Sequence, residues 1–156
     1  MKEILLKVDN NILSVKAFGI YQNNNKILLR RGKNNSYSFP GGAIAFNETA
    51  EQGLIRKLSE EIDQYILVNN LAFISEEFSE SNKHCNHEIC FYYRVTILNK
   101  NILSSDTVKN LQSGADDFVF VEKSKISKLN IKPKNAAEII DRIKSKSVHH
   151  IVIQNT

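Results

Sequence analysis

Two adjacent glycines and two adjacent carboxylates form a pattern between residues 39 and 64 that could bind a metal ion. Gly41 and Gly42 permit a tight turn whose backbone can approach a ligand closely. Glu60 and Glu61 follow on a segment with helical spacing. Carboxylate oxygens are ligands that Mg²⁺ prefers, and this ion commonly completes its shell with water and substrate phosphates. The segment therefore indicates a site for Mg²⁺ or Mn²⁺.

Two further charged residues could hold this segment together. Arg56 and Lys57 share a flank with the two carboxylates, because helical residues three or four apart are neighbours. Arg56 could also hold Glu48, which precedes the helix, in a bidentate pair. A solvated amphipathic helix carries similar charges, so the residue types alone do not distinguish a metal site from an ordinary helix surface.

The elements around this segment predict a mixed α/β domain. A capping box begins at Thr49, and leucine and isoleucine then recur every four residues, which predicts a helix. Strands separated by one long helix and followed by a second predict a mixed β-sheet sandwiched between helices. We expect loops at 75–86 and 99–113, a second helix at 135–146, and strands at 13–21, 26–30, 65–74 with a break at 69–70, 88–98, 117–121 and 148–153.

Composition fits one folded domain spanning residues 1–156. With 42% hydrophobic and 24% charged residues the chain can bury a core, which excludes disorder as a description of the whole. A net charge of +4 suits a phosphate-bearing small ligand about as well as weak nucleic-acid binding, and it is equally compatible with an ordinary soluble surface. The basic stretch at 123–134 lacks the aromatic residues that would favour nucleic acid. We expect no membrane span, no nucleic-acid partner and, because residues 1–7 lack a secretory pattern, a cytoplasmic location.

The spacing of the charged residues resembles the signature of the Nudix hydrolases. That signature reads Gly, five residues, Glu, seven residues, Arg-Glu, an aliphatic residue, any residue, Glu-Glu, any residue, Gly and an aliphatic residue. The resemblance extends over about residues 15–143. The residues that match the signature are Gly42, Glu48, Arg56, Leu58, Glu60 and Glu61.

This resemblance implies a Nudix fold and a reaction. The reaction is Mg²⁺- or Mn²⁺-dependent attack of water on a diphosphate that joins a nucleoside diphosphate to another moiety. By position, the Gly41 carbonyl and the carboxylates of Glu60 and Glu61 would hold the metal, and Glu48 and Arg56 would form a buried pair. These four charged residues are the candidate catalytic residues. A nucleotide-type small molecule is the implied partner, and a homodimer is a candidate assembly because homodimers are common in the family.

Three positions depart from the signature. Lys57 stands where the family has Glu, and Asp63 and Gln64 stand where it has Gly and an aliphatic residue. A Lys charge 5–8 Å from a divalent ion is repelled by roughly 4–7 kcal/mol at an effective dielectric constant of 20, before screening. The usual arrangement of several metals is therefore disfavoured.

Three alternatives for Lys57 remain open. Its side chain could point to solvent while the helix carboxylates and one further carboxylate hold a single metal, the candidates being Glu77, Glu80 and Glu88. It could instead bind phosphate in place of a cation, which would give a catalytically weak protein that binds or senses a nucleotide. Finally, the site could be inactive.

Other residues are candidates for binding substrate. Arg30 and Arg31 are adjacent on a predicted strand, so one of them should point towards the glycine turn and contact phosphate. Lys57 and Glu88 are the remaining substrate-binding candidates. The aromatic run at 91–93 could stack on a base, although core packing is the more common role for such a run.

A zinc site is a weaker hypothesis. It would use His84, Cys85, His87 and Cys90, whose spacing matches no standard zinc pattern and which would have to surround one ion within a short span. We therefore expect both cysteines to be free thiols.

Overall fold

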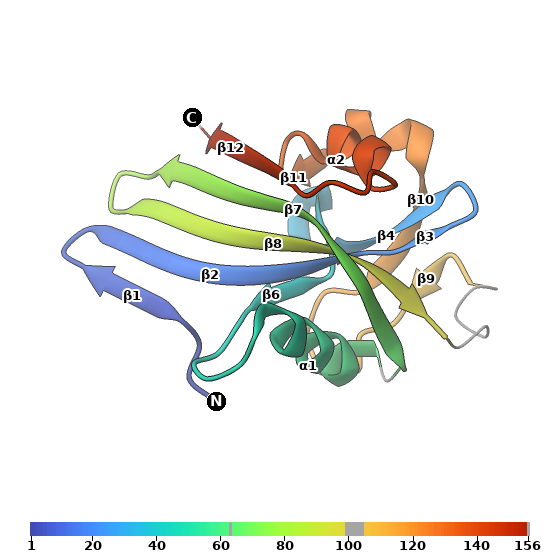
Figure 1. The fold of residues 1–156 in the computed structure, drawn as a ribbon, viewed down its shortest axis with the longest axis horizontal. Helices are drawn as coiled ribbons and strands as arrows, with labels where there is room; N and C mark the ends of the chain where they lie inside the picture. The colour runs from blue at the N-terminus through green and yellow to red at the C-terminus, as the bar shows by residue number, and fades with distance from the viewer. Residues whose placement is uncertain (63, 99–104, 156) are drawn as a thin grey trace.

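The computed structural model describes residues 1–62, 64–98 and 105–155. Within these residues the strands form two mixed six-stranded sheets (Figure 1). In the first sheet the order is β1-β2-β8-β7-β12, and β6 also pairs with β2. Its strands are β1 (Leu5–Val8), β2 (Asn11–Ile20), β6 (Gly41–Ala43), β7 (Ile66–Glu80), β8 (Cys85–Ile97) and β12 (His149–Asn155).

The second sheet has the order β11-β5-β4-β10-β9, and β3 also pairs with β4. Its strands are β3 (Gln22–Asn23), β4 (Lys26–Arg31), β5 (Ser36–Ser38), β9 (Thr107–Val108), β10 (Phe118–Glu122) and β11 (Asn130–Lys132). The predicted mixed α/β class is confirmed, but the strands divide into two sheets rather than one. No described helix is both long and apolar enough to cross a bilayer.

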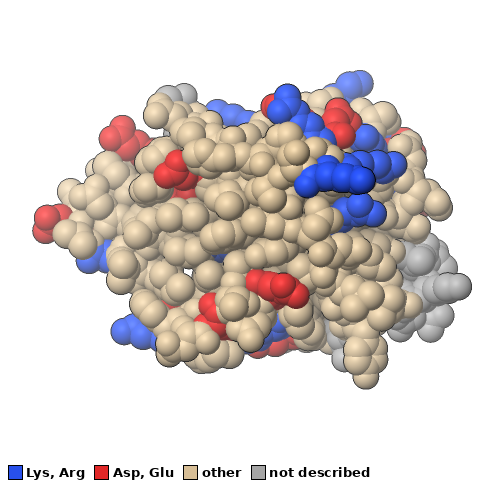
Figure 2. Space-filling model, viewed as in Figure 1, with Lys and Arg blue, Asp and Glu red and all other residues tan. Residues whose placement is uncertain are grey.

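The helices α1 (Ala50–Ile62) and α2 (Ala136–Arg142) lie on opposite sides of the strands (Figure 1). Leu54 and Leu58 of α1 belong to one buried cluster, which also contains residues of β2, β4, β8 and β10. Ile139 and Ile140 of α2 belong to a second cluster around Phe39. Each helix thus buries its apolar face in its own half of the core, as the predicted sandwich requires. Figure 2 shows Lys and Arg side chains gathered around the region of α2 on the viewed face.

The start of α1 follows the predicted capping box. The Thr49 hydroxyl accepts from the Gln52 backbone N–H at 3.1 Å, and the Gln52 side-chain oxygen accepts from the Thr49 N–H at 2.8 Å. This exchange satisfies two backbone donors that a helix start otherwise leaves unpaired. The predicted departures at the other end of the helix include Asp63, which lies outside the described residues.

The predicted break at 69–70 was wrong, and the predicted loop at 75–86 is confined to residues 81–84. Strand β7 is continuous and pairs with β8 on one edge and with β12, in parallel, on the other. Register shifts between Val68 and Asn70 and between Leu71 and Phe73 make the strand irregular without ending it. The polar run beyond residue 74 is a strand because Ser75 and Glu77 bury their side chains on one face while their neighbours point away.

Gly41 allows the glycine turn to pack directly against β2. Its φ of +139° is in the region that favours glycine, and a Cβ there would overlap the Ala17 carbonyl oxygen. Strand β6 can therefore pair with β2, with Gly41 opposite Phe18. The turn is positioned by the sheet on one side and by α1 on the other.

Gly53, inside α1, should resist a substitution that usually stabilises helices. Replacing Gly by Ala in a helix interior typically gains about 1 kcal/mol. A Cβ on Gly53 would lie 2.5 Å from Ile44 Cγ2 and 3.0 Å from Glu48 Oε1. We expect Gly53→Ala to lower the free energy of unfolding by about 2 kcal/mol through overpacking, as measured by urea denaturation.

The matched control is Ser59→Ala, at an exposed position of the same helix. It should be neutral or slightly stabilising, because only the helix propensity changes. A Gly53→Ala protein as stable as the Ser59→Ala protein would contradict the packing argument.

Candidate functional site

An ion pair joins the segment before α1 to the middle of the helix. Arg56 Nη2 lies 2.6 Å from Glu48 Oε1, and Arg56 Nε lies 3.1 Å from Glu48 Oε2. The Ala45 backbone N–H also donates to Glu48 Oε1, at 2.6 Å. The Arg56 guanidinium, through its hydrogen bonds, lowers the pKa of the Glu48 carboxyl. This pair is the connection expected between loop and helix.

Three oxygen atoms of the predicted metal site converge on one side-chain nitrogen. Arg30 Nη2 lies 3.2 Å from the Gly41 carbonyl oxygen and 2.9 and 2.6 Å from the two carboxylate oxygens of Glu61. Glu61 is only 5% exposed. The Arg30 guanidinium also stacks over the Phe118 ring, at 5.3 Å from its centroid. The oxygens expected to hold a metal therefore already surround a positive charge.

Glu61 differs from the other charged residues of α1 because it is buried. Arg56, Lys57 and Glu60 are partly exposed, and Glu60 Oε2 lies 3.9 Å from Arg56 Nη1. The difference arises because Glu61 turns inwards to Arg30. Glu60 therefore remains the more accessible carboxylate, with a side chain that is 46% exposed.

Lys57 extends across the glycine turn to the N-terminal segment. Its Cε atom lies 3.6 Å from the position that a Cβ on Gly42 would take, and its Nζ donates to Glu3 Oε1 at 2.9 Å. Glu3 was not identified from the sequence, because its position depends on an isolated bridge with Ala45. The Lys57 charge thus lies beside the turn and is paired with an acid.

The other predicted residues separate into those near the turn and those away from it. Arg30 points inwards, whereas Arg31 is exposed, as alternation along β4 requires. Glu80 lies at the end of the β7–β8 hairpin, where its carboxylate accepts from the Cys85 thiol at 3.5 Å. Neither Arg31 nor Glu80 joins the predicted site.

A cavity of about 360 Å³ lies beside the glycine turn and contains both Glu77 and Glu88. Lys16 and Lys132 donate to the carboxylate of Glu88, the latter at 3.2 Å. Lys132 belongs to the basic stretch at 123–134, and its side chain is 53% exposed although it contacts Glu88. Its register beside Glu88 depends on strand pairings distant in sequence, so no local pattern could have revealed it.

The zinc hypothesis is not supported by the described residues. Cys85 is exposed and Cys90 is buried, and both are free thiols. His87 stacks on Phe78 with ring centroids 4.3 Å apart. Because alternate strand residues point to opposite faces, the four candidate ligands do not converge.

The family model for the NUDIX domain matches residues 11–142. The chain belongs to the Nudix family. The expected resemblance is therefore confirmed over most of the chain. No curated protein sequence matches this Nudix chain significantly.

Several solved structures share this Nudix fold. The MutT protein from Bacillus halodurans is 16% identical, with a TM-score of 0.63 over 88% of this chain and 89% of that one. An ADP-ribose pyrophosphatase from Streptococcus suis 89-1591 is 13% identical, with a TM-score of 0.58 over 89% of this chain and 98% of that one. The E. coli ORF135 protein is 16% identical, with a TM-score of 0.60 over 85% and 91%. Identities this low show a common fold.

The Glu48–Arg56 pair should make stability depend on pH in the acid range. The pKa of Glu48 is lowered by folding, so its contribution is present at neutral pH and is lost as the pH falls through the folded-state value. We expect Glu48→Gln to lower the free energy of unfolding at neutral pH by about 2 kcal/mol, since a charged hydrogen-bonded pair is lost. The difference from wild type should shrink towards about pH 3.5.

Urea denaturation at both pH values measures this difference. Glu51→Gln, at an exposed position in the first turn of α1, is the control and should follow the wild-type pH dependence. A Glu48→Gln penalty of equal size at both pH values would show that the ionised pair is not its source.

Proposed function

We propose that this Nudix protein is a divalent-metal-dependent hydrolase that cleaves a diphosphate bond in a nucleoside diphosphate joined to another moiety. The observation that carries this proposal is the convergence of the Gly41 carbonyl and the Glu61 carboxylate on a single cationic nitrogen. Membership of a family of pyrophosphate hydrolases supports the reaction class.

The residues present fit a hard divalent cation. The Gly41 carbonyl, Glu61 and the accessible Glu60 form an oxygen donor set of the kind that Mg²⁺ and Mn²⁺ prefer. A bound ion would supply positive charge opposite the diphosphate and lower the pKa of water. Because Arg30 holds two of these donors, Arg30 must leave them when an ion binds.

The basic residues of the site then have a second role. A released Arg30 guanidinium can pair with phosphate oxygens in bidentate geometry. Lys57, beside Gly42, presents a point charge at the turn and can exchange Glu3 for phosphate. The Glu48–Arg56 pair does not need to touch substrate, because its role is to hold the turn against α1.

The second candidate function is a catalytically weak Nudix domain that binds or senses a nucleotide. Its supporting observation is that two basic side chains, Arg30 and Lys57, lie where positive charge is needed. In this alternative Arg30 stays on Glu61, and protein cations alone neutralise the phosphates.

Phosphate release distinguishes the two functions. The substrates are nucleoside triphosphates, ADP-ribose, nucleotide sugars and dinucleoside polyphosphates, with a coupling phosphatase and Mg²⁺ or Mn²⁺. We expect turnover by the wild type and a loss of about a hundredfold or more in Glu61→Gln, because a metal ligand is removed. Glu51→Gln, an exposed glutamate of the same helix, should retain wild-type turnover.

If the wild type shows no turnover, the activity of Lys57→Glu decides between the alternatives. Turnover that appears only in Lys57→Glu would reject the hydrolase and favour the binding function. Turnover by Glu61→Gln at the wild-type rate would also reject the proposed site.

A further inference from the structure

The cavity beside the glycine turn leads from the phosphate end of the site into the protein. Its lining includes exposed Glu3 and half-buried Gly42, the two neighbours of Lys57, and continues to buried Glu77 and Tyr92. A ligand with its phosphates at the turn would therefore place its other end against Glu77.

Glu77 is a buried carboxylate with one oxygen available. The side chain is 3% exposed, and its Oε1 accepts from the Ser75 hydroxyl and the Tyr92 hydroxyl, both at 2.7 Å. Across residues 1–62, 64–98 and 105–155, no hydrogen-bond donor reaches Oε2. This oxygen is open to the cavity and can accept hydrogen bonds from a molecule bound there.

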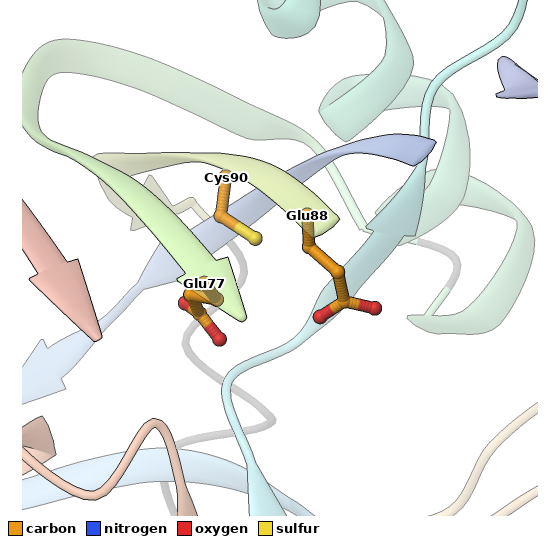
Figure 3. A group of neighbouring side chains, drawn as sticks. All are labelled: Glu77, Glu88 and Cys90. Carbon is orange, nitrogen blue, oxygen red and sulfur yellow. The ribbon is translucent and has the colours of Figure 1, made fainter. Parts of the chain in front are cut away.

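A metal ion is a poor occupant, although Glu77, Glu88 and Cys90 offer ligand atoms within 4.8 Å of one another. Figure 3 shows these three side chains extending from the neighbouring strands β7 and β8. Burial, together with the charge of Glu77, raises the pKa of Cys90 to about 12, so the sulfur stays a protonated thiol. The Glu88 carboxylate is already paired with Lys16 and Lys132.

The remaining walls suit a flat heteroaromatic ring. Phe18 and Tyr92 stack with centroids 5.3 Å apart, and Phe39 meets Tyr92 edge-on at 5.8 Å. All three line the cavity, together with the ammonium-bearing side chains of Lys16 and Lys132. Aromatic walls with a few convergent polar groups are typical of sites for ring-shaped ligands.

From this arrangement we infer that the cavity binds a guanine base, with Glu77 accepting hydrogen bonds from its N1–H and its 2-amino group. A carboxylate only accepts, so it pairs with two adjacent donors. Guanine has such an edge. Adenine and cytosine place an acceptor nitrogen beside their amino group, and uracil flanks its N–H with two carbonyls, so each would turn an acceptor towards Glu77.

The guanine O6 atom supplies the complementary interaction. It is an acceptor next to N1–H, and the two lysines on the cavity wall are donors. This inference rests on the proposed function in one respect: the guanine is taken to be the base of the nucleoside diphosphate in the proposed substrate. Base recognition itself needs neither a metal ion nor turnover.

Binding of GDP, IDP and ADP, measured by calorimetry with EDTA and again with Mg²⁺, tests the inference. IDP differs from GDP only by lacking the 2-amino group. We expect wild type to bind GDP about tenfold more tightly than IDP and about a hundredfold more tightly than ADP, because buried acceptors are left unpaired. In Glu77→Gln the GDP-to-IDP ratio should fall to about one, since the amide presents a donor in place of the free oxygen.

The glutamine can still accept from Ser75 and Tyr92, which preserves the local structure. The control is Glu76→Gln, the adjacent residue of β7, whose carboxylate contacts His150 at 3.0 Å and does not line the cavity. This control should keep the preference for GDP.

Equal wild-type affinity for GDP, IDP and ADP, or no binding of any of them, would overturn the inference without any variant. Retention of the GDP-over-IDP preference in Glu77→Gln would overturn it as well. Guanine-selective binding without turnover would reject only the hydrolase. Turnover without base preference would reject only the guanine site.

Discussion

A carboxylate buried as deeply as Glu61 needs a positive charge beside it. The effective desolvation penalty for a buried ion is several kcal/mol, and only a close, well-oriented partner offsets it. Arg30 provides that charge and also binds the Gly41 carbonyl. The turn can lie against β2 only because residue 41 is glycine. The interaction of Arg30 with Gly41 and Glu61 therefore joins the strand, the turn and the helix.

Ion pairs with protein carboxylates compensate the basic side chains of the site. Each of its basic groups has an acidic partner. A diphosphate alone would displace an acidic group from its basic partner, and a divalent cation alone would displace a basic group from its acidic partner, so in each case one protein charge would be left uncompensated. A diphosphate and a divalent cation that enter together would each take over partners from these ion pairs, so that fewer charges are left uncompensated. The pairs are Arg30–Glu61, Arg56–Glu48, Lys57–Glu3 and the two lysines on Glu88.

These ion pairs also change the expected effect of Lys57 on metal binding. From the sequence, a lysine in place of glutamate indicated strong repulsion of a metal ion. In the structure its ammonium group is directed to Glu3, at the edge of the cavity. The repulsion is therefore reduced by a residue far away in the sequence.

The sequence predicted best what local interactions determine. The capping box at Thr49 and the four-residue apolar spacing were sufficient for α1, because both operate within one helix. The continuity of β7 could not be predicted, since its polar half is stabilised by pairing with β8 and β12.

The same limit applies to the candidate site. The Glu48–Arg56 pair follows from signature spacing, whereas the pairing of Arg30 with Glu61 depends on how two sheets pack against one helix. The contacts of Lys132 and Glu77 depend on the pairing register of strands that are distant in sequence, so local composition could not predict them.

Mn²⁺ affinity, measured by electron paramagnetic resonance, tests the central claim most directly. The proteins to compare are the wild type, Arg30→Gln and the exposed control Arg31→Gln. If the oxygens around Arg30 form the cation site, removing the competing guanidinium should tighten Mn²⁺ binding by about tenfold or more, because the binding-competent state becomes the populated one. Arg31→Gln should match the wild type. Unchanged or weaker Mn²⁺ binding by a folded Arg30→Gln protein would contradict the account.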